Sequence, residues 1–149
     1  MSTFGQYCKK WRLIPSLSKT VTSCFHLNNR EAGKRLQVKL YDEVLRHDFE
    51  PKYLGTTLDR SLNFKKNLSN LSAKLRPRNN LIQKLARTTW GANGQSLRIS
   101  ALSLVYPCAE YCSAVRLNSS HVQMIDVQLN KTMRIISGIV SSTPTAWLP

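Results

Sequence analysis

The stretch PKYLGTTLD, residues 51–59, divides this chain into two kinds of sequence. The residues before it have a mixed pattern of strands and loops, and those after it have a helical pattern. Within the stretch, Leu54, the methyl group of Thr56 and Leu58 alternate with polar or small positions. This alternation predicts a half-buried strand over residues 52–58, in which Gly55 lets another chain approach the backbone closely.

Charge changes abruptly after this stretch. Residues 60–109 contain nine lysines and arginines and no aspartate or glutamate. The whole chain has 22 Lys and Arg against 8 Asp and Glu, a formal net charge of +14 and a pI near 10.1. Such a surplus indicates an anionic partner, with nucleic acid first and an anionic membrane surface second. The alternative is a surplus that serves only solubility.

Length and composition allow a folded core, because 149 residues with 42% apolar content suffice for one domain or two small units. The four cysteines form no paired CxxC framework and are predicted to be reduced thiols. A metal site at Cys108, Cys112 and His121 is a weaker alternative, since no fourth ligand is evident. The sequence has no apolar leader and no run of about 18 apolar residues, so we expect an intracellular protein, nuclear or cytoplasmic, with no membrane partner.

The first part of the chain predicts one helix and several short strands. Residues 4–13 have apolar side chains at helical spacing, with Lys9, Lys10 and Arg12 facing outward. Residues 21–27 alternate as a strand. Residues 34–40 and 44–45 are predicted to form a hairpin around a turn at 41–43.

The second part of the chain predicts helices. A first apolar stripe runs from Phe64 to Leu85, with Ser61 as its N-cap, and Pro77 predicts a kink or break that makes two helices in tandem. Residues 97–105 are apolar on nearly every side and predict a central, buried helix, with Trp90 packed against the bundle. The last helix is marked by a capping box at Ser120 and Gln123 and by a stop at Gly138.

An ordered series of motifs carries a resemblance to a known family. It includes YLGTTLD at 53–59, KLR at 74–76, RNNL at 78–81, TTWGA at 88–92, SALSLVY at 100–106 and PTAWLP at 144–149. From about residue 7 to its end, the chain resembles the downstream half of reverse transcriptases from jockey-like non-LTR retrotransposons. No single motif is decisive, but the ordered series is specific.

The resemblance implies an α+β fold in three parts. Residues 1–59 would be the end of a polymerase palm, made of short antiparallel strands and including the primer-grip strand. Residues 60–140 would be a helical thumb of about three helices, and residues 141–149 a truncated, proline-containing tail. The primer grip would be Tyr53, Leu54 and Gly55, with Tyr53 and Leu54 packed beneath the Gly55 backbone.

The resemblance also implies how the chain meets its ligands. Lys19 matches the family's lysine near the phosphates of the incoming nucleotide, although Ser16 and Leu17 depart from the usual Asn-Pro, and a solvated lysine at a strand entry stays an alternative. The partner would be an RNA–DNA or DNA duplex, the template-primer, held without base reading. The cationic residues expected to contact its phosphates are Lys65, Lys66, Lys74, Arg76, Arg78, Lys84 and Arg87.

Catalytic carboxylates are missing from the sequence. Polymerases use an upstream Asp and an Asp-Asp pair to hold two metal ions, and this chain contains no Asp-Asp. Asp42-Glu43 in a predicted turn is a poor substitute. Mg²⁺ is expected for the full-length polymerase and none for this fragment, which alone would be inactive and would need the missing catalytic half. The alternatives are a stand-alone basic nucleic-acid-binding module and a relic without function.

Overall fold

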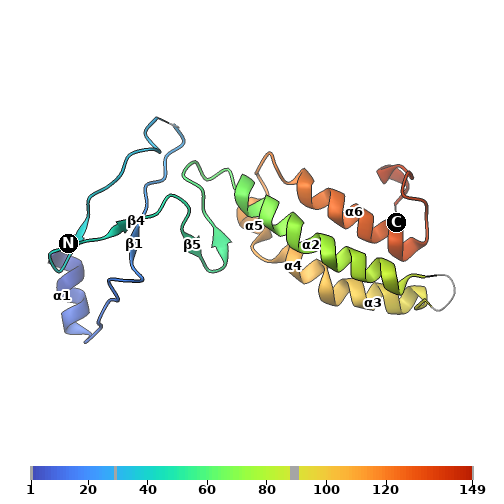
Figure 1. Ribbon diagram of the computed structural model, residues 1–149, viewed down its shortest axis with the longest axis horizontal. Coiled ribbons are helices and arrows are strands. Elements are labelled where there is room, and N and C mark those ends of the chain that lie inside the picture. The colour runs from blue at the N-terminus through green and yellow to red at the C-terminus, as the bar shows by residue number, and fades with distance from the viewer. Residues whose placement is uncertain (1, 29, 88–90, 149) are drawn as a thin grey trace. The chain divides into compact units, whose positions relative to one another are not determined.

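The computed structural model describes residues 2–28, 30–87 and 91–148 and divides the chain into two compact units, residues 1–63 and 64–149. The first unit holds one helix and short paired strands, and the second is helical (Figure 1). The mixed α+β composition predicted from the sequence is therefore confirmed. Trp90 lies outside the described residues, and its expected packing stays a prediction.

Helix α1, Ser2–Lys10, opens the first unit. It begins and ends earlier than the predicted span of 4–13. Its end is a backbone reversal at Arg12, which has φ 52°, and the amide of Leu13 donates to the Cys8 carbonyl at 2.8 Å. The chain leaves the helix through this left-handed residue.

Among the described residues of the first unit, the strands form three separate pairs. Strand β1, Val21–Thr22, pairs in parallel with β4, Arg46–His47, so the prediction of antiparallel strands is wrong for this pair. Strands β2, Lys39–Leu40, and β3, Glu43–Val44, form the expected hairpin, although β2 is much shorter than the predicted 34–40. Its turn places Tyr41 and Asp42 at positive φ.

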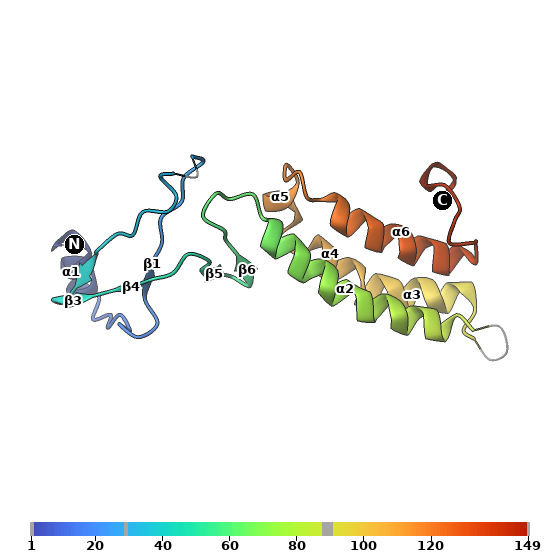
Figure 2. The same cartoon turned by 45° about the horizontal axis from the view of Figure 1, so that its top comes forward.

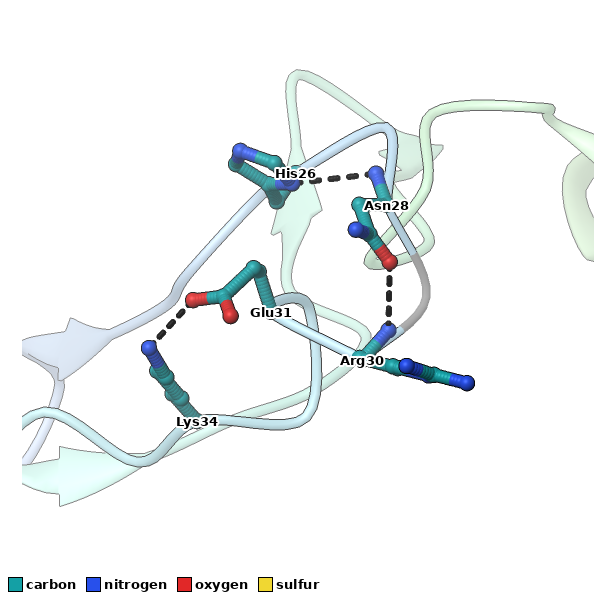
Figure 3. A network of polar contacts seen from close by, with 5 residues as sticks. All are labelled: His26, Asn28, Arg30, Glu31 and Lys34. Carbon is teal, nitrogen blue, oxygen red and sulfur yellow. Dashed lines mark hydrogen bonds and ion pairs between the residues drawn. The ribbon is translucent and has the colours of Figure 1, made fainter.

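The predicted strand over residues 21–27 also extends too far, because β1 and its pairing with β4 end at Thr22. The ring Nδ1 of His26 accepts a hydrogen bond from the Asn28 amide at 3.0 Å, and the Asn28 side chain accepts one from the Arg30 amide at 3.0 Å (Figure 3). An ion pair joins Lys34 to Glu31 one turn further on. These side chains satisfy backbone donors within the loop itself, as short polar residues commonly do in turns.

Helices of the second unit are α2, Lys65–Leu85; α3, Gly94–Leu104; α4, Tyr106–Glu110; α5, Ser113–Arg116; and α6, Gln123–Ser137. A short 3₁₀ helix, η1, follows at Thr145–Trp147. Helix α3 runs antiparallel to α2, and α6 lies beside α2 in the same direction (Figures 1 and 2). Hydrogen bonds that join residue 79 to 128 and residue 80 to 131 agree with this parallel alignment.

One apolar cluster forms the core of the second unit. It draws on the predicted α2 stripe, on the start and end of the α3 segment and on α6. Leu75 and Ile82 of α2 and Val105 after α3 are fully buried. The buried members are Leu68, Leu71, Leu75, Ile82, Leu97, Val105, Ala109 and Ile125.

Helix α2 corrects two predictions. It continues unbroken through Pro77, so it is one helix and not two in tandem. Pro77 is exposed, and buried Leu75 and Ile82 on either side of it belong to the same core, which offsets the lost backbone hydrogen bond. The N-cap is Phe64, in a left-handed conformation with φ 59° and no side-chain cap, so the N-cap prediction for Ser61 is wrong.

Helices α3 and α6 correct two more. Leu97 and Ala101 of α3 are buried, but Ile99 and Leu102 are 57% and 51% exposed, so α3 is not a central helix. The two exposed residues follow helical periodicity and fall on the face away from the core. Helix α6 begins at Gln123 without a side-chain cap, so the Ser120 capping box is absent, whereas the predicted stop at Gly138 is confirmed by its φ of 66°.

A buried polar clasp, formed by Asn79, Gln128 and Thr132, joins α2 to α6. The Asn79 side chain is fully buried, and its Nδ2 donates to the Gln128 carbonyl at 2.9 Å. The Thr132 hydroxyl donates to Asn79 Oδ1 at 2.6 Å and lies 3.0 Å from the Gln128 carbonyl. Because buried amides need partners, the clasp fixes the register of the two helices.

Replacing Pro77 by alanine restores the amide that donates to the Ala73 carbonyl. We expect Pro77→Ala to raise the free energy of unfolding by up to about 3 kcal/mol, the helix propensity difference, less the loss of proline's rigidity in the unfolded chain. Chemical denaturation of the full chain measures it. A lower stability would contradict the position of Pro77 on an open helix surface.

Removing the Asn79 side chain breaks the polar clasp. Asn79→Ala leaves the Thr132 hydroxyl without its Asn79 acceptor and should cost about 2–3 kcal/mol of unfolding free energy. Neighbouring Asn80 is the matched control, because its side chain is exposed and accepts a hydrogen bond from Lys131 Nζ at 3.3 Å on the surface. Asn80→Ala should change stability by less than about 0.5 kcal/mol. Equal effects in a denaturation series would refute the clasp.

Candidate nucleic-acid interface

The outer surface of α2 carries most of the predicted cationic site. Lys65, Lys66, Lys74, Arg76 and Lys84 are all exposed on this helix. Arg87 follows the helix end and is exposed as well. The structure thus brings six of the seven predicted phosphate-binding residues to the accessible surface along one element. We call the five residues on the helix the α2 basic surface.

Helical geometry spreads this surface along the axis. Lys66 and Lys84 are five full turns apart, so they project in the same direction, opposite to Leu68, Leu75 and Ile82 in the core. A rise of 1.5 Å per residue separates them by about 27 Å. A nucleic-acid strand advances about 3.4 Å per phosphate, so this distance matches roughly eight nucleotides.

Arg78 has a different environment from the other six. Its side chain is half-buried, and one guanidinium nitrogen, NH1, donates to the Leu104 carbonyl at 2.7 Å. This bond satisfies an acceptor at the C-terminal end of α3, where helix carbonyls lack intrahelical partners. Arg78 therefore links α2 to α3. We assign it a structural role in helix packing in preference to a role in phosphate binding.

Lys131 of α6 is a cation that sequence reasoning missed. Its Nζ lies 3.3 Å from the Asn80 side-chain oxygen on α2. Asn80 is one turn beyond Arg76, so Lys131 extends the α2 basic surface toward α6. Sequence alone gave no sign of this neighbourhood, because it depends on the parallel packing of two helices some fifty residues apart.

Charge balance sets the second unit apart. Residues 64–149 hold eleven lysines and arginines but only two acidic residues, Glu110 and Asp126. In residues 1–63, eleven basic residues are accompanied by six acidic ones. An excess of one sign on a small unit creates a field that attracts polyanions and steers their association.

Not every arginine of the second unit is available to a ligand. Arg116 is 6% exposed, and its NH2 nitrogen donates to the carbonyls of Ala109 and Tyr111 at 3.0 and 2.6 Å. Burial lowers the pKa of the Arg116 guanidinium, and neighbouring Cys112 and Cys108 oppose that shift. Arg134 similarly donates twice to the Thr143 carbonyl and fastens the C-terminal segment.

The predicted primer-grip residues form the tip of a hairpin. Strands β5, Lys52–Tyr53, and β6, Thr56–Thr57, pair antiparallel around a two-residue turn of Leu54 and Gly55. Both turn residues have positive φ, 46° and 80°. The single strand predicted over 52–58 is therefore wrong, and Gly55 is needed first for the turn geometry.

Exposure at this tip reverses a second expectation. Tyr53 and Leu54 are 67% and 70% exposed, so they do not pack beneath the backbone. Thr56 and Thr57 are buried instead. A Leu-Gly pair in the middle of an alternating run was the available signal, because glycine there marks a reversal as readily as a close approach.

Lys19 lies at the end of a turn just before β1 and is exposed. Its amide donates to the Ser16 carbonyl at 3.2 Å, and the following Thr20 hydroxyl donates to the same carbonyl at 2.7 Å. These bonds fix the backbone of the turn, while the lysine side chain is exposed. Nothing in the structure tests a phosphate role for it.

Metal-binding chemistry finds little support in the described part of the chain. Residues 2–28, 30–87 and 91–148 contain no group of three or more His, Cys, Asp or Glu side chains placed to hold an ion. That Mg²⁺ belongs to the full-length polymerase and not to this fragment stays a prediction. Within the same ranges, no helix has the length and apolar character to cross a membrane.

Comparisons with known proteins identify a class that agrees with the motifs and the basic surface. Over about nine-tenths of its length, this chain is similar to a segment of RNA-directed DNA polymerases from mobile elements. The resemblance to jockey-like non-LTR retrotransposon polymerases is thereby confirmed. No family model matches the chain, and no solved structure matches it.

Particular relatives come from fruit flies. The chain is 31% identical over 146 residues to the RNA-directed DNA polymerase from mobile element jockey of Drosophila melanogaster, and 30% identical over 146 residues to that of Drosophila funebris. It is 28% identical over 143 residues to the probable RNA-directed DNA polymerase from transposon X-element of Drosophila melanogaster. These matches cover 93%, 93% and 91% of this chain, which spans about 15% of the length of each relative.

Leu54 is unusual at a position with positive φ, which asparagine adopts more easily. Leu54→Asn creates the Asn-Gly pair favoured in such turns and should stabilise the hairpin by about 1 kcal/mol. Hydrogen exchange at the Leu58 amide, which donates to the Pro51 carbonyl across the hairpin, should slow by roughly fivefold. Leu54→Val, β-branched and worse at positive φ, should speed it. Faster exchange in the asparagine variant would contradict the turn.

Proposed function

We propose that this chain is the palm-end and thumb segment of a retrotransposon reverse transcriptase, and that its second unit holds the template-primer duplex by its phosphates. The main observation in support is the α2 basic surface. It is exposed over about 27 Å on a helix whose opposite face packs in the core. Similarity to RNA-directed DNA polymerases supports the choice of a nucleic-acid partner.

Phosphate contacts of this kind suit a polymerase. Lysine and arginine neutralise phosphates without reading bases, so the grip is the same for any template sequence. The α2 helix is rigid because Asn79 and the apolar stripe fix it against α6, which holds the cations at constant spacing. Lys131 widens the contact to a second helix.

The hairpin tip is a second contact in this proposal. Tyr53, Leu54 and Gly55 project from the first unit as an exposed turn, available to a primer end. An exposed tyrosine presents a flat aromatic face on which a base or sugar can pack, next to Lys52 for the phosphate. Buried Thr56 and Thr57 anchor the hairpin from behind.

Polymerisation itself belongs to the rest of the enzyme in this proposal. The metal-binding carboxylates, and the Mg²⁺ that they hold in the full-length polymerase, would come from a catalytic half outside this chain. This segment would hold the template-primer duplex and position it for the catalytic half. Alone, we expect it to bind duplex and extend no primer.

The test is binding to a labelled RNA–DNA hybrid across a salt series. Lys74→Gln, Arg76→Gln and Lys84→Gln together should weaken binding by about tenfold or more near 0.1 M salt and lower the slope of log affinity against log salt by up to about 3, because each lost phosphate contact contributes roughly 0.9 or less. Fluorescence anisotropy measures both quantities.

A charge-matched control separates this surface from net charge. Lys9→Gln, Lys10→Gln and Lys39→Gln remove the same charge from exposed positions in the first unit. This control should bind within about twofold of the unmodified chain at each salt concentration. If both triple variants weaken equally, or if the unmodified chain shows no binding at low salt, the phosphate-grip proposal fails.

A further inference from the structure

Both acidic residues of the second unit line the same cavity. Glu110, at the end of α4, and Asp126, in the first turn of α6, are exposed at a cavity of about 300 Å³. Elsewhere, residues 64–149 carry only basic charge. The placement therefore concentrates all of the unit's negative charge at one opening.

Apolar side chains form the rest of this acid-rimmed cavity. Leu68 of α2, Ala109 of α4 and Ile125 of α6 are 1%, 8% and 6% exposed and belong to the core behind it. Leu117, at the end of α5, is 71% exposed and lines the opening. A volume near 300 Å³ is at the small end of ligand sites and accepts one or two apolar side chains.

Arg116 lies in the cavity wall but does not make it an anion site. Its guanidinium is committed to the Ala109 and Tyr111 carbonyls and reaches Asn67 Oδ1 at 3.4 Å. Those bonds hold the α4–α5 corner in place. With the arginine's donors committed and two carboxylates at the opening, this place favours a cationic ligand over a phosphate more than the rest of the unit does.

We propose that the acid-rimmed cavity is a docking site for a basic amphipathic helix of a protein partner. Apolar side chains of the partner helix, one turn apart, enter the cavity. Lysines or arginines of the partner beside them pair with Glu110 and Asp126. Charge complementarity carries the assignment, because a nucleic acid is disfavoured at the only acidic opening of a basic unit. The site is separate from the phosphate grip on α2 and does not rest on it.

A probe with this chemistry exists in the chain's own α1 segment. Phe4, Tyr7 and Trp11 are 46%, 55% and 60% exposed at helical spacing, next to Lys9 and Lys10. A labelled peptide of residues 2–14, added to the full chain, should bind saturably in fluorescence anisotropy. A scrambled peptide of the same composition, without apolar residues at one-turn spacing, should bind at least fivefold more weakly.

Variants that neutralise the two carboxylates at the cavity opening test their contribution to peptide binding. Glu110→Gln with Asp126→Asn should weaken peptide binding by about threefold to thirtyfold, as expected for two partly exposed ion pairs. The control, Asp42→Asn with Glu43→Gln, removes the same charge from the exposed β2–β3 hairpin and should change the affinity by less than twofold. Thermal unfolding checks that both variants stay folded.

Three outcomes would overturn the proposal: no saturable peptide binding, equal binding of the scrambled peptide, or equal weakening in the two neutral variants. Binding of the RNA–DNA hybrid is measured in parallel. It should not weaken in the Glu110→Gln, Asp126→Asn variant, because removing negative charge cannot reduce attraction for phosphates. Failure at the cavity is thereby distinguished from failure of the phosphate grip.

Discussion

The buried hydrogen bonds of Asn79 are the constraint on which the second unit depends. An amide with no access to water must find partners, and Asn79 finds them in the Gln128 carbonyl and the Thr132 hydroxyl of α6. Apolar packing alone tolerates sliding, whereas this pairing permits one register. The register also sets which cations lie together, since it places Lys131 of α6 3.3 Å from the side-chain oxygen of Asn80, the residue next to Asn79. A core interaction thus determines the shape of the outer surface.

Two faces of the unit follow from the same packing. The outward side of α2 carries lysines and an arginine without an acidic neighbour in its sequence, while Glu110 and Asp126 meet at the cavity formed by α2, α4, α5 and α6. Opposite charges on separate surfaces would let the two proposed ligands, a nucleic acid and a basic polypeptide, bind this unit without competition. Arg116, in the wall of the cavity, and Arg134 both donate hydrogen bonds to backbone carbonyls and hold their segments in place.

Sequence patterns predicted features that depend on local spacing and glycine stereochemistry, and missed those that depend on tertiary packing. The Phe64–Leu85 stripe gave the core face of α2, and Gly138 gave the end of α6, because spacing and glycine stereochemistry act locally. Pro77 suggested a break because proline removes a backbone hydrogen bond from the helix. Burial of Leu75 and Ile82 in the same core outweighs that loss. The Leu54-Gly55 turn was missed because the alternation of apolar and polar residues over 52–58 fits a single strand and a hairpin equally well. Lys131 and the cavity required tertiary packing, which no local pattern contains.

Lysine accessibility on the intact chain tests the central claim most directly. Each lysine is acetylated briefly, with and without excess RNA–DNA hybrid, and quantified by mass spectrometry. The account predicts that Lys66, Lys74 and Lys84 lose reactivity by severalfold when the hybrid is present, while exposed Lys9, Lys10 and Lys39 react as before. Equal protection of both groups, or protection confined to the first unit, would contradict the α2 surface as the place where the nucleic acid lies.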